Sequence, residues 1–187
     1  MKPRTVFFIG KPGCGKGTQT KLLAKRTGWR SISAGVMFRT IAEEDTAVGG
    51  KIKAEIDAGD LAPHWFAMYL YLKSLFSIGQ QEHVIFDGFN RKIEEARLVI
   101  DSLTWLERSC AIIYIAISDD TVRSRLVGRK EIEGRADDNA VEERLKEYRE
   151  YTEPAIDLFR QADAFIEVDG EQAPDKIAEE IYTALSV

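Results

Sequence analysis

The chain has 187 residues with a formal net charge of −5 at pH 7, and 44% of its residues are hydrophobic. This length suits one compact domain, and the acidic balance argues against a non-specific nucleic-acid binder, which normally presents a basic surface. Because the sequence has only Cys14 and Cys110, and no apolar run near the roughly 20 residues that span a bilayer, it favours a protein of the reducing cytoplasm with neither a disulfide framework nor a membrane anchor.

Short apolar segments predict the strands of one sheet. The first, residues 6–9, stops at Gly10 and is interpreted as a strand, not as a signal peptide. The further apolar candidates are residues 84–86, 111–117 and 165–168, and residues 30–33 are a shorter, weaker candidate. Largely unbroken apolar character is typical of parallel strands that are covered on both faces.

Helical patterns lie between these strands. The first follows a glycine-rich loop through Arg26, and the others cover about 63–75, 93–103, 140–159 and a last segment from about Pro174. Pro63 is expected in the first turn of its helix, and Pro154 is expected to interrupt the longest one. Strands that alternate with helices predict an α/β fold, a doubly wound parallel sheet with helices on both faces. Residues 33–62 and 128–138 are interpreted as excursions from this core.

The glycine-rich loop, residues 10–18, reads GKPGCGKGT and joins the first strand to the first helix. Glycines let backbone N–H groups converge on phosphate oxygens, and the helix N-terminus adds partial positive charge. The Lys16 ammonium can reach the β- and γ-phosphates, whereas the Thr18 hydroxyl comes one residue later than in the commonest pattern. Cys14 is interpreted as a small packing residue, with a reactive thiol as the alternative. The loop predicts an ATP site made of Gly13, Cys14, Gly15, Lys16, Gly17 and Thr18.

A cluster of arginines stands out in an otherwise acidic chain. Its members are Arg123, Arg125, Arg129, Arg135 and Arg144. One interpretation is a local site for a small polyanion, and the other is a solvated charged face of a helix. Charge alone does not separate the two.

Five motifs follow one another along the chain. They are GKPGCGKGTQT at the loop, SAGVMFR at 33–39, DGFNR at 87–91, RLVGR at 125–129 and GRADD at 134–138. In this combination the sequence resembles the adenylate kinase family of nucleoside monophosphate kinases over nearly its whole length. The short step from Arg129 to Arg135 resembles the short-lid form, which implies no zinc.

The resemblance implies a P-loop fold that moves the γ-phosphoryl group of ATP to a nucleoside monophosphate with Mg²⁺. It also implies a single domain over residues 1–187, with a small helical acceptor flap at about 33–62 and a lid at about 128–138. ATP and the monophosphate are the expected partners, without nucleic acid or membrane. The chain is expected to be a monomer, because no exposed apolar heptad appears.

Arginines carry most of the site that the resemblance implies, because their planar fork binds phosphate bidentately and keeps its proton. Arg39 and Arg91 are expected on the acceptor's phosphate, and Arg125 beside the ATP base. The expected catalytic residues are Lys16, Arg91, Arg129, Arg135 and Arg144. Arg144 follows Asp138 at a shorter spacing than is usual for the family. This spacing leaves open where the helix starts and in which direction the Arg144 side chain points.

The remaining implied contacts divide between metal, ATP and acceptor. Asp87 is expected to order Mg²⁺ through water, and Gln172 and Arg129 to contact ATP. The acceptor contacts are expected at Ala34, Arg39, Asp60, Leu61, Ala62, Gly88, Phe89, Asn90, Arg91, Glu95, Arg135 and Arg144.

The sequence departs from the family pattern at positions near the acceptor and the metal. Ala34 replaces a usual threonine, Val36 an aspartate, Asn90 a proline and Glu95 a glutamine. A glutamine amide pairs with both N1 and N6 of adenine, whereas an ionised Glu95 only accepts and matches the two adjacent donors of guanine. In a dry site the mismatch with adenine costs on the order of 1–3 kcal/mol. The other matches favour AMP as the acceptor, with GMP or a pyrimidine monophosphate as alternatives.

Two rival functions stay open. A non-catalytic nucleotide-binding regulatory module is favoured by the departures at Val36 and Glu95. The retention of Lys16, Asp87 and the motif arginines argues against it. A kinase for another small molecule on the same fold is disfavoured because the paired Arg39 and Arg91 suit an acceptor that carries phosphate.

Overall fold

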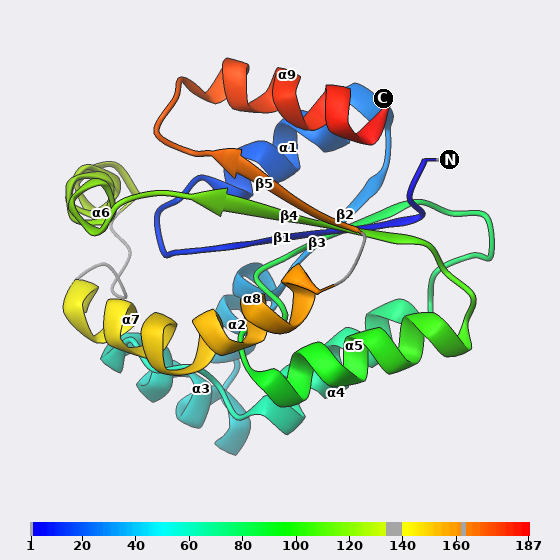
Figure 1. Ribbon diagram of the computed structural model, residues 1–187. Coiled ribbons are helices and arrows are strands. Elements are labelled where there is room, and N and C mark those ends of the chain that lie inside the picture. The colour runs from blue at the N-terminus through cyan, green and yellow to red at the C-terminus, as the bar shows by residue number, and fades with distance from the viewer. Residues whose placement is uncertain (1, 134–139, 162–163) are drawn as a thin grey trace.

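The computed structural model describes residues 2–133, 140–161 and 164–187, and for residues 129–133 the backbone alone. Its centre is a five-stranded parallel sheet in the order β2-β3-β1-β4-β5 (Figure 1). The strands are β1 Thr5–Gly10, β2 Arg30–Ser33, β3 Val84–Asp87, β4 Cys110–Ala116 and β5 Phe165–Asp169. All the predicted strands, including the weak candidate at β2, are thereby confirmed.

Both faces of the sheet are buried, which explains the unbroken apolar runs. On β1, Phe7 joins one core cluster, whereas its neighbours Val6 and Phe8 join the other, because successive side chains of a strand point to opposite faces. Phe7 lies in register with Phe86 of β3, and the two rings stack at 5.2 Å. The central strand β1 therefore contributes side chains to the core on each face of the sheet.

Helices cover each face of the sheet. In Figure 1, α1 and α9 lie above it, and α4, α5 and α8 lie below. The bounds are α1 Lys16–Thr27, α4 His64–Leu75, α5 Ile93–Trp105, α6 Asp119–Glu133, α8 Glu153–Arg160 and α9 Pro174–Leu185. The doubly wound α/β fold is confirmed, and none of the described helices is long and apolar enough to cross a membrane.

The structure differs from the sequence-based predictions in three helical regions. Pro63 is the N-cap residue of α4 and not part of its first turn. The longest predicted helix is split into α7 Val141–Glu147, a π-helical turn η2 Tyr148–Thr152, and α8. Pro154, in the first turn of α8, has no N–H to continue the i→i−4 ladder, so the break precedes it. Helix α6 was not predicted, because it is strongly charged and its pattern was interpreted only as an arginine cluster.

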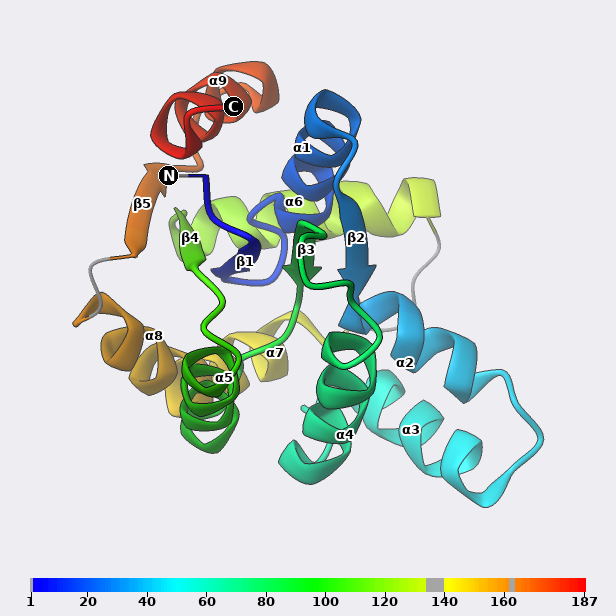
Figure 2. The same ribbon diagram turned by 90° about the vertical axis from the view of Figure 1, so that its right-hand side faces the viewer.

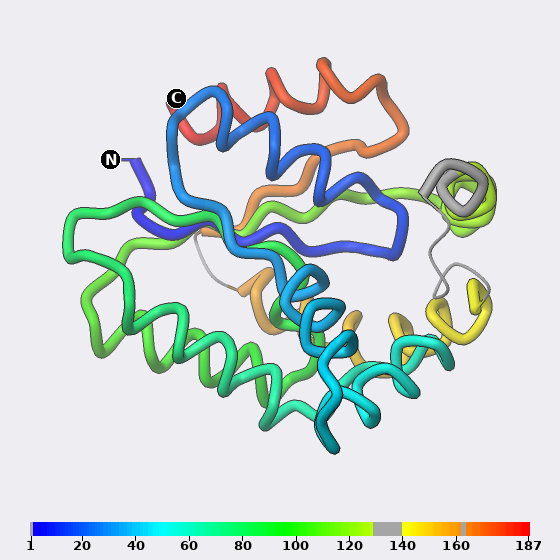
Figure 3. The backbone as a smooth tube through the Cα atoms, turned by 180° about the vertical axis from the view of Figure 1, so that it is seen from behind, coloured from blue at the N-terminus to red at the C-terminus, as the bar shows by residue number. Residues whose placement is uncertain are grey.

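The excursion at residues 33–62 is helical. It consists of α2 Ala34–Ala42 and α3 Ala47–Ala58, which project from the β2 edge of the molecule (Figure 2). The view from behind shows the same pair, in blue to cyan, beside α4 (Figure 3). We call this segment the flap. The predicted lid at 128–138 begins within α6, and its later part, residues 134–138, lies outside the described residues.

Candidate functional site

A cavity of about 1010 Å³ opens beside the carboxyl ends of the central strands. Its walls are the glycine-rich loop and the start of α1, the flap, the loop after β3, and α7. Open α/β sheets bind ligands at this edge, and the volume lies at the upper end of the range for ligand sites. The cavity is the candidate site of this chain.

The glycine-rich loop has a backbone that side chains would disturb. Gly10, Gly13 and Gly15 all have positive φ, of 140°, 74° and 102°. A Cβ on Gly10 would lie 2.6 Å from the carbonyl oxygen of Ile115. Gly15 is also the N-cap of α1, so the loop leads its backbone N–H groups into a helix N-terminus. This is an anion-binding geometry.

Lys16 is held over this loop. Its Nζ donates to the carbonyl oxygens of Gly10 and Lys11, both at 2.8 Å, and lies 3.4 Å from the Cys14 sulfur. Burial lowers the pKa of the Lys16 ammonium, while nearby Cys14 and Asp87 raise it. A phosphate entering the loop would therefore meet a partly desolvated cation. The Cys14 thiol is buried, which agrees with its interpretation as a small packing residue.

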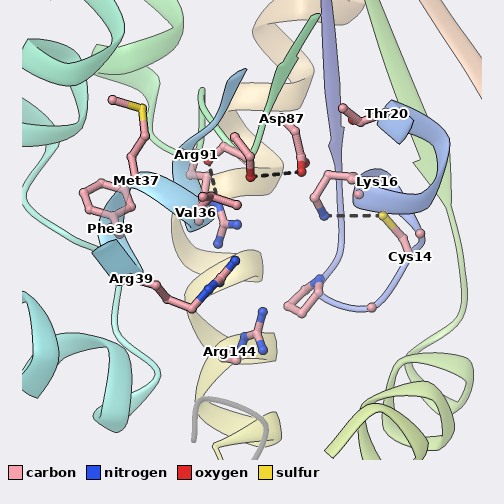
Figure 4. A pocket seen from close by; sticks show the side chains of 18 of the residues that line it. Cys14, Lys16, Thr20, Val36, Met37, Phe38, Arg39, Asp87, Arg91 and Arg144 are labelled. Carbon is pink, nitrogen blue, oxygen red and sulfur yellow. Dashed lines mark hydrogen bonds between the residues drawn. The ribbon is translucent and has the colours of Figure 1, made fainter. Parts of the chain in front are cut away.

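Three arginines enter the cavity from different elements. Figure 4 shows Arg39 from α2, Arg91 from the loop after β3, and Arg144 from α7, all directed into the same space. Arg91 donates from Nε to the carbonyl oxygen of Gly88 at 3.1 Å. Arg144 lines the cavity despite its unusual spacing from Asp138. Such a convergence of cations suits a ligand with several negative charges.

Asp87 stands opposite Lys16 at the end of β3. Its Oδ2 accepts the Ser33 hydroxyl at 3.3 Å, and a Cβ on Gly17 would lie 3.8 Å from the same oxygen. Carboxylate and hydroxyl oxygens are ligands that suit Mg²⁺, which keeps most of its waters and uses few protein carboxylates. These residues therefore fit an indirectly bound Mg²⁺. Val36 offers no oxygen there and is 56% exposed.

Glu95 is a buried acid in the wall of the cavity. It is 3% exposed and lines the cavity, and its Oε2 accepts the backbone N–H of Arg91 at 2.8 Å. Burial raises the pKa of the Glu95 carboxyl, against the opposing effects of Arg91, Lys92 and His64. Ionised Glu95 offers a ligand only acceptors, and protonated Glu95 would also offer a donor.

Arg125 and Gln172 lie at the opposite rim. Arg125 donates to the carbonyl oxygens of Cys14 at 3.4 Å and Gly170 at 2.8 Å. Gln172 donates to Glu180 at 2.8 Å, and both Arg125 and Gln172 line the cavity. Both residues therefore lie next to the glycine-rich loop, at the rim of the same cavity.

The expected residues mostly come together around this cavity. Those that line it are Gly13, Cys14, Gly15, Lys16, Gly17, Thr18, Ala34, Arg39, Asp60, Leu61, Ala62, Asp87, Gly88, Arg91, Glu95, Arg125, Arg144 and Gln172. The side chain of Arg129 and the whole of Arg135 lie outside the described residues.

Phe89 and Asn90 do not line the cavity. The Phe89 ring packs against Phe86 at 5.5 Å and Tyr71 at 6.0 Å. Asn90 is buried, has φ of 66°, and its side-chain amide has no hydrogen-bond partner among the described residues. Proline, usual here in the family, is locked near −65°, so this loop has its own backbone course. The expectation of acceptor contacts from these two side chains is therefore not supported.

Sequence reasoning missed other residues of the cavity wall, among them Thr20, Glu55 and Glu147. Glu147 accepts the backbone N–H of Leu61 at 3.2 Å, which ties the end of the flap to α7. This contact joins segments far apart in sequence and had no local signal. For Thr20 the sequence did contain a local signal, because Thr20 lies one helical turn after Lys16.

Comparison with known proteins agrees with this geometry. The family model described as adenylate kinase matches residues 8–164. An adenylate kinase of Thermus thermophilus is 33% identical, with 98% of each chain covered. An adenylate kinase of Maricaulis maris is 34% identical, covering 96% of this chain and 97% of its own length. An adenylate kinase of Clavibacter michiganensis is 32% identical, with 97% and 92% covered.

Proposed function

The chain belongs to the adenylate kinase family, and on that premise we propose that it transfers the γ-phosphoryl group of ATP to AMP in a reversible, Mg²⁺-dependent reaction. Family membership supports a phosphotransferase that acts on a nucleoside monophosphate. One observation carries the proposal. Lys16 on the glycine-rich loop and Arg39, Arg91 and Arg144 on three other elements line a single cavity (Figure 4).

The roles follow from charge and position. The loop and Lys16 would hold the donor phosphates, and Arg39 and Arg91 would hold the acceptor's phosphate. Arg144, with Arg129 and Arg135, would stabilise the charge on the transferring group. The acceptor oxygen is already ionised at neutral pH, so no general base is required. Catalysis would then consist of positioning and charge neutralisation.

Asp87 and Ser33 would hold the waters of Mg²⁺, which on bound ATP neutralises charge on the β- and γ-phosphates. The flap lies over the acceptor side and would exclude water, which otherwise competes for the phosphoryl group. We propose the flap and the lid as the two moving parts of a single domain.

The acceptor base is the open part of the proposal, because Glu95 favours a second candidate. With Oε2 bound to Arg91 N–H, an ionised Glu95 presents a negative acceptor to the cavity. Guanine offers adjacent N1–H and N2–H₂ donors to a carboxylate, whereas adenine offers N6–H₂ beside the N1 lone pair. GMP is therefore the alternative acceptor.

The test is ATP-dependent formation of diphosphates with AMP, GMP, CMP and UMP offered separately, first with Mg²⁺ and then with EDTA. We expect ADP from AMP, with loss of the activity in EDTA. A preference of more than about tenfold in kcat/KM for another base would replace AMP. Tight ATP binding without turnover on any acceptor would instead favour the non-catalytic module.

Two further expectations belong to this proposal. We propose that the chain acts in the cytoplasm, where reduced thiols persist, since Cys14 and Cys110 are both free. We also propose that it acts as a monomer, because the residues assigned to both substrates come from one chain. Sedimentation of the protein with and without nucleotides would test the second point, and a stable dimer would contradict it.

A further inference from the structure

Thr20 carries a buried hydroxyl that the proposed function does not use. The residue is 5% exposed, and its Oγ1 has no hydrogen-bond partner among the described residues. A helical threonine commonly donates to the carbonyl of the preceding turn, as Thr27 of the same helix does to Leu23 at 2.7 Å. A buried hydroxyl without a partner lowers stability. Its presence therefore calls for an explanation.

Thr20 faces the part of the cavity that contains Asp87. It lies four residues after Lys16 and three after Gly17 on α1, so the three positions share one face of the helix. A Cβ on Gly17 would lie 3.8 Å from Asp87 Oδ2, which places that face of α1 against the end of β3. Thr20 and Asp87 both line the cavity, and Figure 4 shows the Thr20 side chain near those of Lys16 and Asp87.

The Asp87 carboxylate already accepts a hydrogen bond from another hydroxyl. Ser33, at the end of β2, donates to Asp87 Oδ2 at 3.3 Å. Thr20 approaches from the other side, on α1. Two hydroxyls and one carboxylate form a set of oxygens suited to the waters that Mg²⁺ keeps around it. The nearby Val36 on α2 contributes no such oxygen.

We propose that Thr20 is a positioning residue for the metal–nucleotide complex. Its hydroxyl donates to the Asp87 carboxylate and accepts a hydrogen bond from a water of Mg²⁺ when ATP is bound. The inference rests on the proposed function, since it requires ATP and Mg²⁺ at the glycine-rich loop. It explains why the protein keeps a buried hydroxyl that no other described residue uses.

The first test measures stability without nucleotide and in EDTA. Thr20→Val removes the hydroxyl at nearly constant shape and is expected to raise Tm by about 2–4 °C, because it removes an unpartnered buried group. Thr27→Val removes a hydroxyl that is bonded on the same helix, and is expected to lower Tm. If Thr20→Val lowers Tm as Thr27→Val does, the hydroxyl has a structural partner and the inference is wrong.

The second test measures binding, with Mn²⁺ as a paramagnetic probe. The affinity for Mn²⁺·ATP, followed by electron paramagnetic resonance, is compared with the affinity for ATP in EDTA. We expect the ratio of the two affinities to fall about tenfold in Thr20→Val, the lower end of losses seen when groups behind a metal's ligands are removed. Thr20→Ser keeps the hydroxyl and is expected to restore the ratio. An unchanged ratio in Thr20→Val would overturn the inference.

This outcome is separable from a failure of the proposed function. A wild-type protein that transfers phosphoryl groups normally, with a Thr20→Val variant that matches it in metal dependence, overturns the role of Thr20 alone. A wild-type protein that binds Mn²⁺·ATP and converts no monophosphate overturns the proposed function, while the binding ratio still decides the role of Thr20.

Discussion

The two walls of the cavity are built differently. The proposed donor wall is the glycine-rich loop, which joins β1 to α1 in the middle of the sheet, where nearly every side chain of β1 is buried. The proposed acceptor wall is the flap, in which α2 buries only Ala34 and α3 only Gly49 and Ile52. Stability is therefore unevenly distributed, and local opening is expected first in the flap.

The difference agrees with what each wall is proposed to bind. The loop uses backbone N–H groups, whose directions are fixed only if the surrounding core is rigid. The flap contributes Arg39, which lies in the last turn of α2 and lines the cavity. Because α2 and α3 project from the edge of the molecule (Figure 2), the flap is suited to open for substrates and close over them. Each of the following variants changes one of these walls or an element beside it, and so tests the contrast.

The largest effect is expected on the donor wall. Lys16→Met should lower kcat by about 10³-fold, because it removes a preorganised positive charge from the transferring phosphates. Thermal unfolding should change little, because the cost of burying the Lys16 ammonium opposes the two hydrogen bonds that it donates to loop carbonyls. The exposed Lys25→Met on the same helix is the control and should leave the rate unchanged. A Lys16→Met enzyme within tenfold of the wild-type rate would contradict the assignment.

Next come the two arginines proposed for the acceptor's phosphate. Arg91 lies on the loop after β3, a strand of the core, and Arg39 lies on the flap. Arg91→Lys should lower kcat/KM for the monophosphate by about 100-fold, because lysine lacks the planar fork and the Nε–H that donates to Gly88. Arg39→Lys, on the flap, should raise KM for the acceptor with a smaller change in kcat. Initial-rate kinetics with varied AMP separate the two. Identical effects of both variants on kcat would mean that an arginine on the core and an arginine on the flap do not differ in this way.

Glu95→Gln should shift both base choice and pH dependence. We expect kcat/KM for AMP to rise about tenfold, because the amide can pair with both N1 and N6 of adenine. The rate with GMP should fall. Competition between the two monophosphates measures the shift directly, and an unchanged preference would mean that Glu95 does not contact the base.

The same variant tests the raised pKa of Glu95. A carboxyl whose pKa is raised on folding binds more protons in the folded state, so stability falls as pH rises from the unfolded pKa through the folded one. Glu95→Gln removes this loss. The variant should therefore be more stable than the wild type at pH 7–8, and its advantage should shrink towards pH 4. Denaturant unfolding at both pH values checks the sign.

The smallest effects are expected within the flap. Gly59 ends α3 with φ of 85°, and a Cβ there would lie 2.6 Å from the Ala140 Cβ beside α7. Gly59→Ala should lower the free energy of unfolding by about 1–2 kcal/mol and disturb the contact between flap and α7. Gly50→Ala, inside α3 with no atom within 4 Å, should raise it by about 0.5–1 kcal/mol. Opposite signs would show that Gly59, unlike Gly50, is constrained by its backbone conformation together with its neighbours.

The sequence by itself determined the features that have a local cause. Buried parallel strands require continuous apolar segments, so four strands of the sheet were visible in their own residues, whereas β2, in which only Ile32 is buried, was a short candidate. The glycine-rich loop was equally clear, because its positive φ angles and its lysine lie within a few residues of one another. The motif arginines were named from the resemblance to the adenylate kinase family, and nothing in the sequence placed them in space.

Only the tertiary structure decided how these residues meet. Arg39, Arg91 and Arg144 are distant in sequence and converge because parallel strands bring their carboxyl ends, and the segments that follow them, to one edge of the sheet. The burial of Glu95 and the unpartnered hydroxyl of Thr20 depend on what other elements place around them. Periodicity and motifs report which way a residue faces along its own element, but not which groups from other elements it meets there.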